Sequence, residues 1–400
     1  MLGLATGLIA PSLGLAAAAW DERVAEALAF SDDTGTWRAQ ASGMVSLSAY
    51  HGPQENPGLI FTEKDLLVSP RLALFLDAQV GPRVSGFVQA RLDRGFDPGD
   101  GSAEFRLDEY ALRMALSREA ACQIEIGKFA TVVGNWVARH DEWQNPFVNA
   151  PLPYEYLTGV TDEQAPASPA DLVSPEGAEL YEHLPIIWGP SYATGVSLSA
   201  QPGRFDVALE IKNTGLSSRP DAWTLGAVGF EHPAWSVRLG FRPDLRFKLG
   251  VSASDSVFLL PAAAATLPAG QRLGSYRERL WGQDFSFEWR HLQIWAELFE
   301  AQFELPPVGT ARTVAGYVEL RYKLAPRLSG AMRWNQQVFS SVRAPGVATR
   351  WGTDLARVDL AATYRCSLQS QLKAQVSGVV RSGGQHRPGA TWALQYLLRF

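Results

Sequence analysis

The sequence predicts an all-β protein, a transmembrane antiparallel β-barrel of about sixteen strands, or of eighteen. Apolar and polar residues alternate with period two through most of 37–400, in stretches long enough for a tilted strand to cross a bilayer. The residues are 46% hydrophobic, but no long apolar block follows the first twenty residues, which excludes a helical membrane protein. Short and long turns alternate between the stretches, as they do in bacterial barrels.

The first part of the chain is typical of an exported precursor. Residues 1–19 carry no charge, end in the run Ala16–Ala19, and are followed by Asp21. This layout predicts a signal peptide over 1–19, although the usual positively charged start is missing. We expect a short periplasmic segment over 20–36 and the barrel over 37–400.

The predicted strands form hairpins. Leu72, Leu74 and Leu76 alternate with polar neighbours, and the chain returns after Gly81-Pro82 with the alternation intact. Two further pairs are expected, 194–200 with 205–211 and 223–231 with 235–241. The expected short turns are 81–82, 202–203, 232–233 and 325–326, and the expected longer connections are 52–64, 96–103, 261–276 and 341–354.

Aromatic side chains gather near the ends of the predicted strands. A ring with one polar edge favours the headgroup zone of a bilayer, so these residues predict two aromatic girdles. The core of a soluble β-sandwich is the alternative explanation. The expected girdle residues are Trp37, Tyr50, Trp223, Trp235, Tyr322, Trp334, Tyr364 and Trp392.

The C-terminal stretch places apolar or aromatic residues at every even position of 392–400 and ends in Phe400. It resembles the final strand of bacterial outer-membrane proteins. The resemblance implies the outer membrane of a Gram-negative bacterium, with its lipids as surroundings. It also implies recognition by the barrel-assembly machinery, with Trp392, Tyr396 and Phe400 as the assembly signal.

A second resemblance covers 105–134, where RLDEYALRMALS is followed, after a turn, by QIEIGKFATVVG. This pattern resembles the porin O and P family, also called phosphate-selective-porin-like. The resemblance implies a sixteen-stranded barrel, a homotrimer, and diffusion of anions or small polar solutes. Phosphate selectivity does not carry over, because the sequence shows no clustered lysine ladder.

The strand rhythm breaks over 139–190, far beyond the length of an ordinary loop. Nine acids and no Lys or Arg occur between Asp141 and Pro190, together with several Trp, Tyr and Pro residues. We expect a loop that folds inward and narrows the pore; a solvated loop on the outer surface is the alternative. The candidate constriction residues are Arg139, Asp141, Glu142, Glu155, Asp162 and Glu163.

Along each predicted strand, the period-two alternation shows which residues point into the barrel, and most of the charged residues among them are basic. Opposite an acidic constriction they would create a transverse field that favours polar solutes. Simple wall ion pairs, with no preference for any solute, are the alternative. The candidate pore-wall residues are Arg38, Arg71, Arg91, Arg113, Arg333, Arg357 and Arg365.

These features together predict passive diffusion of ions and small hydrophilic solutes. The alternatives are a plugged structural or adhesive barrel without conductance and an exported soluble β-protein. A plug should pack apolar residues into the lumen, whereas the inward faces are expected to be mostly Arg, Ser, Gln and Gly.

The sequence indicates no enzyme, cofactor or metal site, because the six histidines are scattered and no Gly-x-Ser-x-Gly pattern occurs. One hydrolase arrangement is kept as a minor alternative, with the pair His140-Asp141 beside Ser168, Ser174 or Ser191. The net charge of -5 argues against a nucleic-acid partner.

Overall fold

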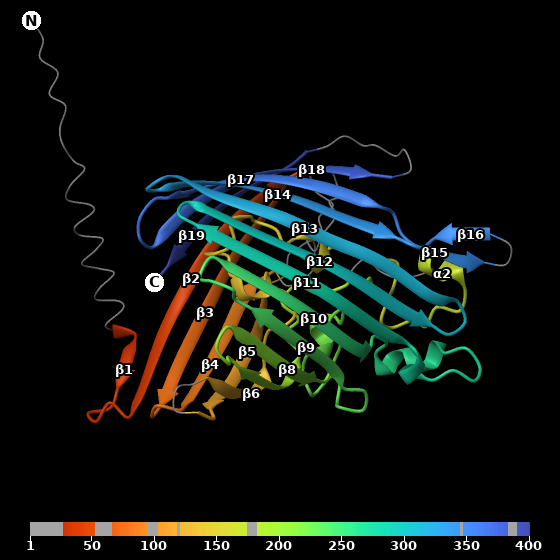
Figure 1. Ribbon diagram of the computed structural model, residues 1–400, viewed down its shortest axis with the longest axis horizontal. Helices are drawn as coiled ribbons and strands as arrows, with labels where there is room; N and C mark the ends of the chain where they lie inside the picture. The colour runs from red at the N-terminus through yellow and green to blue at the C-terminus, as the bar shows by residue number, and fades with distance from the viewer. Residues whose placement is uncertain are drawn as a thin grey trace, which may run out of the picture.

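The computed structural model describes residues 27–52, 66–94, 103–117, 121–173, 182–344, 347–382 and 390–400, so the expected signal peptide lies outside the described residues. Within the described part, sixteen antiparallel strands form a closed barrel (Figure 1). They are β2 (Trp37–His51), β3 (Leu66–Val80), β4 (Val84–Asp93), β5 (Glu104–Ala115), β6 (Cys122–Lys128), β7 (Thr194–Ala200), β8 (Phe205–Lys212), β9 (Ala234–Phe241), β10 (Phe247–Val257), β11 (Arg277–Trp289), β12 (Leu292–Leu305), β13 (Gly309–Ala325), β14 (Leu328–Phe339), β17 (Leu355–Arg365), β18 (Ser370–Arg381) and β19 (Ala390–Arg399). The predicted fold class is confirmed.

Each barrel strand pairs with its sequence neighbours, and β19 pairs with β2 to close the ring, from Trp392 opposite His51 to Arg399 opposite Met44. Short turns such as 81–83, 201–204 and 326–327 join the strands at one end, called here the short-turn end. Longer connections such as 213–233, 258–276 and 340–354 lie at the other end, the long-loop end. The expected alternation of turn lengths is confirmed in the described part except at 306–308, a short turn at the long-loop end, and nearly all of the expected connections 52–64 and 96–103 lies outside the described residues.

One predicted strand is wrong. Residues 223–231 are not extended but belong to the 213–233 connection, so His232-Pro233 is not a short turn. The amide of Asn213 donates to the carbonyl of Val228 at 2.9 Å, and the Trp223 ring nitrogen donates to the carbonyl of Ser218 at 2.8 Å. These local bonds fold the stretch back on itself and replace the ladder that a strand would need.

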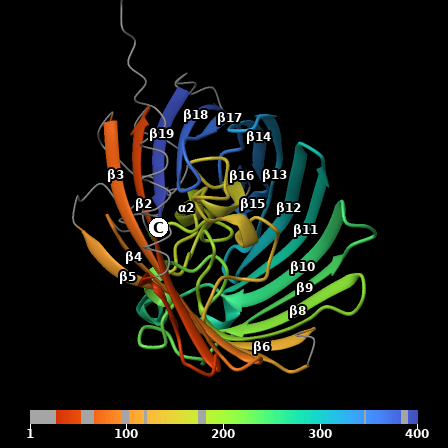
Figure 2. The same cartoon turned by 90° about the vertical axis from the view of Figure 1, so that its left-hand side faces the viewer.

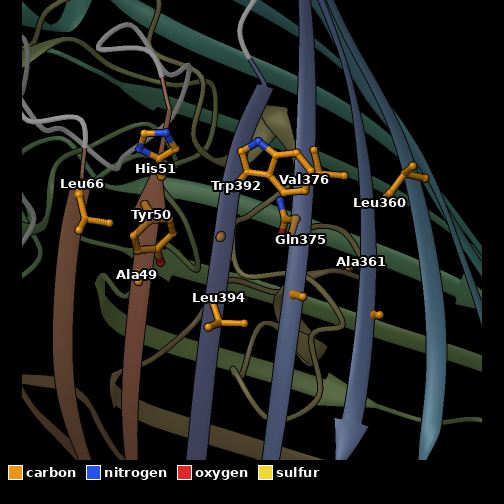
Figure 3. A pocket seen from close by; sticks show the side chains of 13 residues that line it. Ala49, Tyr50, His51, Leu66, Leu360, Ala361, Gln375, Val376, Trp392 and Leu394 are labelled. Carbon is orange, nitrogen blue, oxygen red and sulfur yellow. The ribbon is translucent and has the colours of Figure 1, made fainter.

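The outer face of the barrel is apolar because alternate residues of each strand point away from the lumen. Leu47, Leu239, Leu298 and Leu360 are among the exposed outward residues. Figure 3 shows part of this face, where a groove over β17, β18, β19 and β2 is bordered by Leu360, Val376, Trp392 and Leu394. Among the described residues, no helix has the length and apolar character needed to span a membrane.

Six of the eight expected girdle residues are exposed on the outer face: Trp37, Trp235, Tyr322, Trp334, Tyr364 and Trp392. The other two expectations are wrong. Trp223 is buried in the 213–233 connection. Tyr50 shares the inward face with its strand partners Leu67 and Ala393, because it is one residue out of phase with the outward Ala49.

Three short strands lie outside the ring. β1 (Ala29–Ser31) pairs with Arg38–Gln40 of β2, beyond the point where β19 ends, and so covers part of an otherwise open edge. β15 (Ser341–Ala344) and β16 (Val347–Arg350) form a hairpin in the 340–354 connection. The helices in the described residues are short, namely η1 (Val137–Arg139), η2 (Leu152–Tyr154), α2 (Pro169–Val173), η4 (Pro220–Ala222), η5 (Pro261–Thr266) and η6 (Leu273–Ser275).

Candidate functional site

The connection between β6 and β7, residues 129–193, lies inside the ring of strands (Figure 2). We call it the lumen segment; its residues 174–181 lie outside the described part. The inward path that the sequence predicted is therefore confirmed, but the break in the strand rhythm begins at Phe129 and ends at Ala193, wider than the expected 139–190. A segment with almost no regular structure needs other partners for its backbone, and the barrel wall supplies them.

One side of the lumen is apolar. Trp136 and Tyr154 of the lumen segment stack with ring centroids 4.5 Å apart, and Tyr154 meets the edge of Phe299 at 5.9 Å. The expectation of inward faces made mostly of Arg, Ser, Gln and Gly is wrong on this side, because β11, β12 and β13 turn large apolar side chains into the lumen. The buried apolar residues on the inward face of these strands are Leu280, Phe299, Ala301, Phe303, Leu305, Ala311, Ala315 and Tyr317.

Carboxylates on the wall strands accept hydrogen bonds from the backbone of the lumen segment near its start. Glu109 accepts the backbone N–H of Ala130 at 2.8 Å, and Glu210 accepts that of Val132 at 3.2 Å. A carboxylate that accepts backbone N–H groups makes charge-assisted bonds, which are stronger than bonds between neutral groups. These side chains therefore replace the strand partners that the segment lacks.

Glu297 of β12 binds both the backbone and a side chain of the lumen segment. It accepts the backbone N–H of Trp136 at 3.0 Å and the hydroxyl of Tyr154 at 2.8 Å. Gly134 makes the approach possible, because it has a φ of +78° and a Cβ at this position would lie 2.5 Å from a Glu297 carboxylate oxygen. The bend at Gly134 and the carboxylate of Glu297 thus fix the segment together.

The next arc of the wall, formed by β14, β17 and β18, uses arginines and amides. Arg333 and Arg357 donate to the carbonyl of Ala150 at 3.1 and 2.6 Å. The side-chain oxygen of Asn335 accepts the backbone N–H of Leu152 at 3.2 Å, and that of Gln375 accepts the backbone N–H of Val148 at 2.7 Å. These contacts place 148–152 against β14, β17 and β18.

The predicted constriction residues lie at the boundary between the lumen segment and its surroundings, most of them in ion pairs. Arg139 reaches Glu319 at 2.5 Å, and Arg219 holds Asp162 at 2.9 Å and Glu163 at 2.5 Å. Asp141 instead accepts the backbone N–H of Trp143 at 3.0 Å. The remaining two acids pair with predicted wall residues, Glu142 with Arg71 and Glu155 with Arg357.

Burial and pairing shift the pKa values of these groups in different directions. Burial raises the pKa of Glu155 although Arg357 opposes the shift, and burial raises the pKa of Asp162 to about 6 despite Arg219. For Glu142, burial also acts to raise the pKa, but the charges of Arg71 and Arg91 outweigh it and lower the pKa. Burial lowers the pKa of His140.

All seven predicted pore-wall arginines occupy the inward phase of their strands. Arg91 pairs with Asp108 at 2.8 Å, Arg113 with Glu125 at 2.9 Å, and Arg333 with Asp359 at 3.0 Å. Arg38 and Arg365 are exposed, and neither has an acid within 4.0 Å in the described part of the chain. Five of the seven predicted wall arginines are therefore paired, and the two without an ion pair in the described part, Arg38 and Arg365, lie near the short-turn end.

The three residues of the predicted assembly signal lie on the outer face where β19 and the terminal residue pair with β2 and close the barrel. Trp392 and Tyr396 are exposed there. Phe400 exchanges two backbone hydrogen bonds of 2.9 Å with Gly43, and its ring occupies the place where a Cβ of residue 43 would lie. Gly43 thus leaves room for the terminal ring at the point where the barrel closes.

The period-two phase of their strands is enough to point Glu109, Glu210 and Glu297 inward, but it does not predict what they bind. Their partners are backbone groups, which no residue pattern marks. Asn335, Gln375 and Arg219 were missed altogether: an amide in an inward phase looks like any pore-lining residue, and Arg219 lies in a connection far along the chain from its partners.

The hydrolase arrangement is not formed in the described part of the chain. The two ring nitrogens of His140 bond to the carbonyl of Val137 and the hydroxyl of Tyr192, both at 2.5 Å. Ser168 donates to Asp171 at 2.9 Å, and neither Ser168 nor Ser191 bonds to His140. Ser174 lies outside the described residues.

Solved structures with a similar fold are bacterial outer-membrane barrels. OmpF of Salmonella typhi, in complex with daunomycin, is 12% identical with a TM-score of 0.59, and the match covers 93% of this chain and 100% of that one. The anion-selective porin of Comamonas acidovorans is 9% identical with a TM-score of 0.56, covering 91% and 100%. A loop-deletion mutant of OmpT from Vibrio cholerae is 9% identical with a TM-score of 0.57, also covering 91% and 100%.

No family model and no curated protein matches the sequence. At these identities the structural likeness shows the fold alone. The fold is that of a porin-type β-barrel, and the outer membrane is the location that these barrels share, in agreement with the expectation from the sequence.

Proposed function

We propose that the protein is a porin of the Gram-negative outer membrane that allows passive diffusion of ions and small hydrophilic solutes, and that it is not an enzyme. The observation that carries the proposal is a set of inward charges that keep contact with water beside the lumen segment. The side chain of Arg71 is 30% exposed and that of Arg91 is 18% exposed. At the short-turn end, a hollow of about 530 Å³ is lined in part by Arg38, Asp77 and Arg113.

The passage in this proposal runs between the lumen segment and the wall formed by β2 to β5. Glu142 faces Arg71 and Arg91 there, so a solute passes between charges of opposite sign, and the field favours polar solutes. The constriction role assigned to Arg139, Asp141, Glu142, Glu155, Asp162 and Glu163 belongs to this proposal. Of these acids, Glu142 is the one placed beside the passage.

The finer assignments belong to the same proposal. They are membership of the porin O and P family, cleavage of a signal peptide over 1–19, a periplasmic segment over 20–36, and insertion by the barrel-assembly machinery into outer-membrane lipids. A homotrimer is also proposed, and a trimer form of OmpT from Vibrio cholerae is among the structural neighbours. The resemblance of 105–134 supports the family and the trimer, and that of the C-terminal strand supports insertion by the assembly machinery. The uncharged start with the run Ala16–Ala19, followed by Asp21, supports the signal peptide and the segment after it.

The second candidate is a plugged structural or adhesive barrel with no conductance. The apolar core between the lumen segment and β11 to β13 favours it, because a plug is expected to pack apolar residues into the lumen. Many inward side chains between the two ends of the barrel are also buried, including Ser46, Gln89, Glu210 and Gln395.

Single-channel recording of the refolded mature chain in a planar bilayer, under a salt gradient, separates the two candidates. Stable ohmic steps are expected, and Arg71→Gln should shift the reversal potential toward cations because it removes a charge from the passage. Arg246→Gln is the control, because Arg246 pairs with Asp244 in the turn between β9 and β10 and lies outside the proposed passage. Silence from correctly folded protein, judged by heat-modifiable gel migration, would overturn the diffusion proposal in favour of the plug.

A further inference from the structure

The tip of the lumen segment lies among basic residues near the short-turn end. The Arg399 guanidinium stacks on the Trp143 indole at 4.3 Å from the ring centroid, and that of Arg365 lies 5.7 Å from the same centroid. Arg321 of β13 approaches the carbonyl of Gln144 at 3.5 Å. Three guanidinium groups from β13, β17 and β19 therefore gather around one exposed turn of the segment.

None of these three arginines has an acid within 4.0 Å among the described residues, in contrast to the paired arginines at mid-height. The acids of the neighbourhood are already engaged: Glu142 by Arg71, and Glu319 by Arg139 and Arg333. Asp141 accepts the backbone N–H of Trp143. The balance of charge around Trp143 is therefore positive. Glu319 is the acid that offsets part of the repulsion between Arg321 and Arg365, and it already pairs with Arg139 and Arg333.

The turn that presents Trp143 is firmly held. Gln371 donates to the carbonyl of Trp143 at 3.1 Å, and Lys373 donates to that of Glu142. The indole also packs against Met44, Ala73 and Leu397 of the wall. Arg365 and Arg399 are exposed, so the platform is rigid while its charges face water.

We propose that Arg321, Arg365 and Arg399 form a binding site at the short-turn end for small organic polycarboxylates, with Trp143 as its floor. Guanidinium groups present paired donors that match carboxylate oxygens. Several separate guanidinium groups favour a ligand with several carboxylates over a monovalent ion, because each additional carboxylate engages another uncompensated charge. The assignment deepens the proposed porin function but does not require ion flow.

Calorimetric titration of citrate into the detergent-folded full chain tests the site. We expect binding that weakens about tenfold in the double variant Arg365→Gln/Arg399→Gln, the loss of one or two charge-assisted contacts. Arg321→Gln/Arg365→Gln serves as a second variant that leaves the C-terminal strand intact. Arg246→Gln is the control: Arg246 lies in another short turn and pairs with Asp244 at 2.9 Å, so its removal should change binding by less than about twofold.

The competing outcomes are distinct. Equal citrate binding by the parent and both double variants, or no binding by the parent, would overturn the site. Binding of acetate or inorganic phosphate as tight as that of citrate would overturn the assignment to polycarboxylates. Citrate binding without ion current would support the binding site and overturn the diffusion proposal. Ion current without citrate binding would support diffusion and overturn the binding site.

Discussion

Along β11, β12 and β13 the wall meets the lumen segment mainly through apolar side chains, whereas along β14, β17 and β18 it meets the same segment through arginines and amides. Apolar contact is non-directional and proportional to buried area, so the first wall holds the segment mainly by packing and fixes its backbone chiefly where Glu297 accepts the N–H of Trp136. Hydrogen bonds to backbone groups require defined positions, so the second wall fixes the path. Packing therefore dominates on one arc of the barrel wall, and backbone hydrogen bonds dominate on the arc next to it.

The largest effect is expected from the apolar wall. Phe299 is fully buried against Tyr154, and Phe299→Ala leaves a cavity that should destabilise the packed segment by about 4 kcal/mol. The adjacent Leu298 is 50% exposed on the outer face, so Leu298→Ala is the matched control. Denaturant unfolding and protease cleavage within 129–193 measure the difference. Equal loss in both variants would mean that the segment does not depend on this core.

The polar wall should respond to loss of one arginine with a somewhat smaller change. Arg357 is buried between Glu155 and Asp359, and Arg357→Gln leaves Glu155 without its partner at a cost of about 3 kcal/mol. The expected result is faster amide hydrogen exchange over 148–156, while the amides of β11 to β13 stay protected. Arg242→Gln, which removes a 43% exposed arginine far from the segment, should leave exchange unchanged. Uniform loss of protection would contradict the division between the two walls.

How far the sequence predicts this molecule depends on the kind of interaction. Alternation of residues predicts the barrel, the apolar outer face and the inward phase of residues such as Arg71 and Glu297, because side-chain direction follows from strand geometry alone. It does not predict that Glu297 binds the backbone at Trp136, nor that Phe299 and Tyr317 form a core with the segment. Those contacts depend on the path of a chain with no repeating pattern. The wrong strand at 223–231 has the same origin, since side-chain bonds of Asn213 and Trp223 override a weak alternation.

A pH-dependent effect is expected from His140, which lies between Trp136 and Tyr192 inside the segment. Burial lowers its pKa below the ordinary value of 6.5. Above pH 6.5 the imidazole is neutral whether the segment is packed or not, and the packing free energy is fully present. Below pH 6.5 the unpacked form gains a proton first, so packing is lost as the pH falls toward the lowered pKa. Protease resistance should decline over this range in the parent and stay flatter in His140→Gln; identical profiles would exclude His140 as the titrating group.

The smallest effect is expected where the wall carries charge but does not touch the segment. Arg113 pairs with Glu125 at 2.9 Å, its side chain is 43% exposed, and its guanidinium lies 4.2 Å from the Phe87 ring centroid. Because water screens such a pair, Arg113→Gln should change the free energy of unfolding by less than about 1 kcal/mol and leave cleavage of the segment unchanged. Its charge nevertheless borders the hollow at the short-turn end, so the reversal potential should move toward cations. A large loss of stability with no change in ion preference would show that this wall, too, serves packing and not the passage.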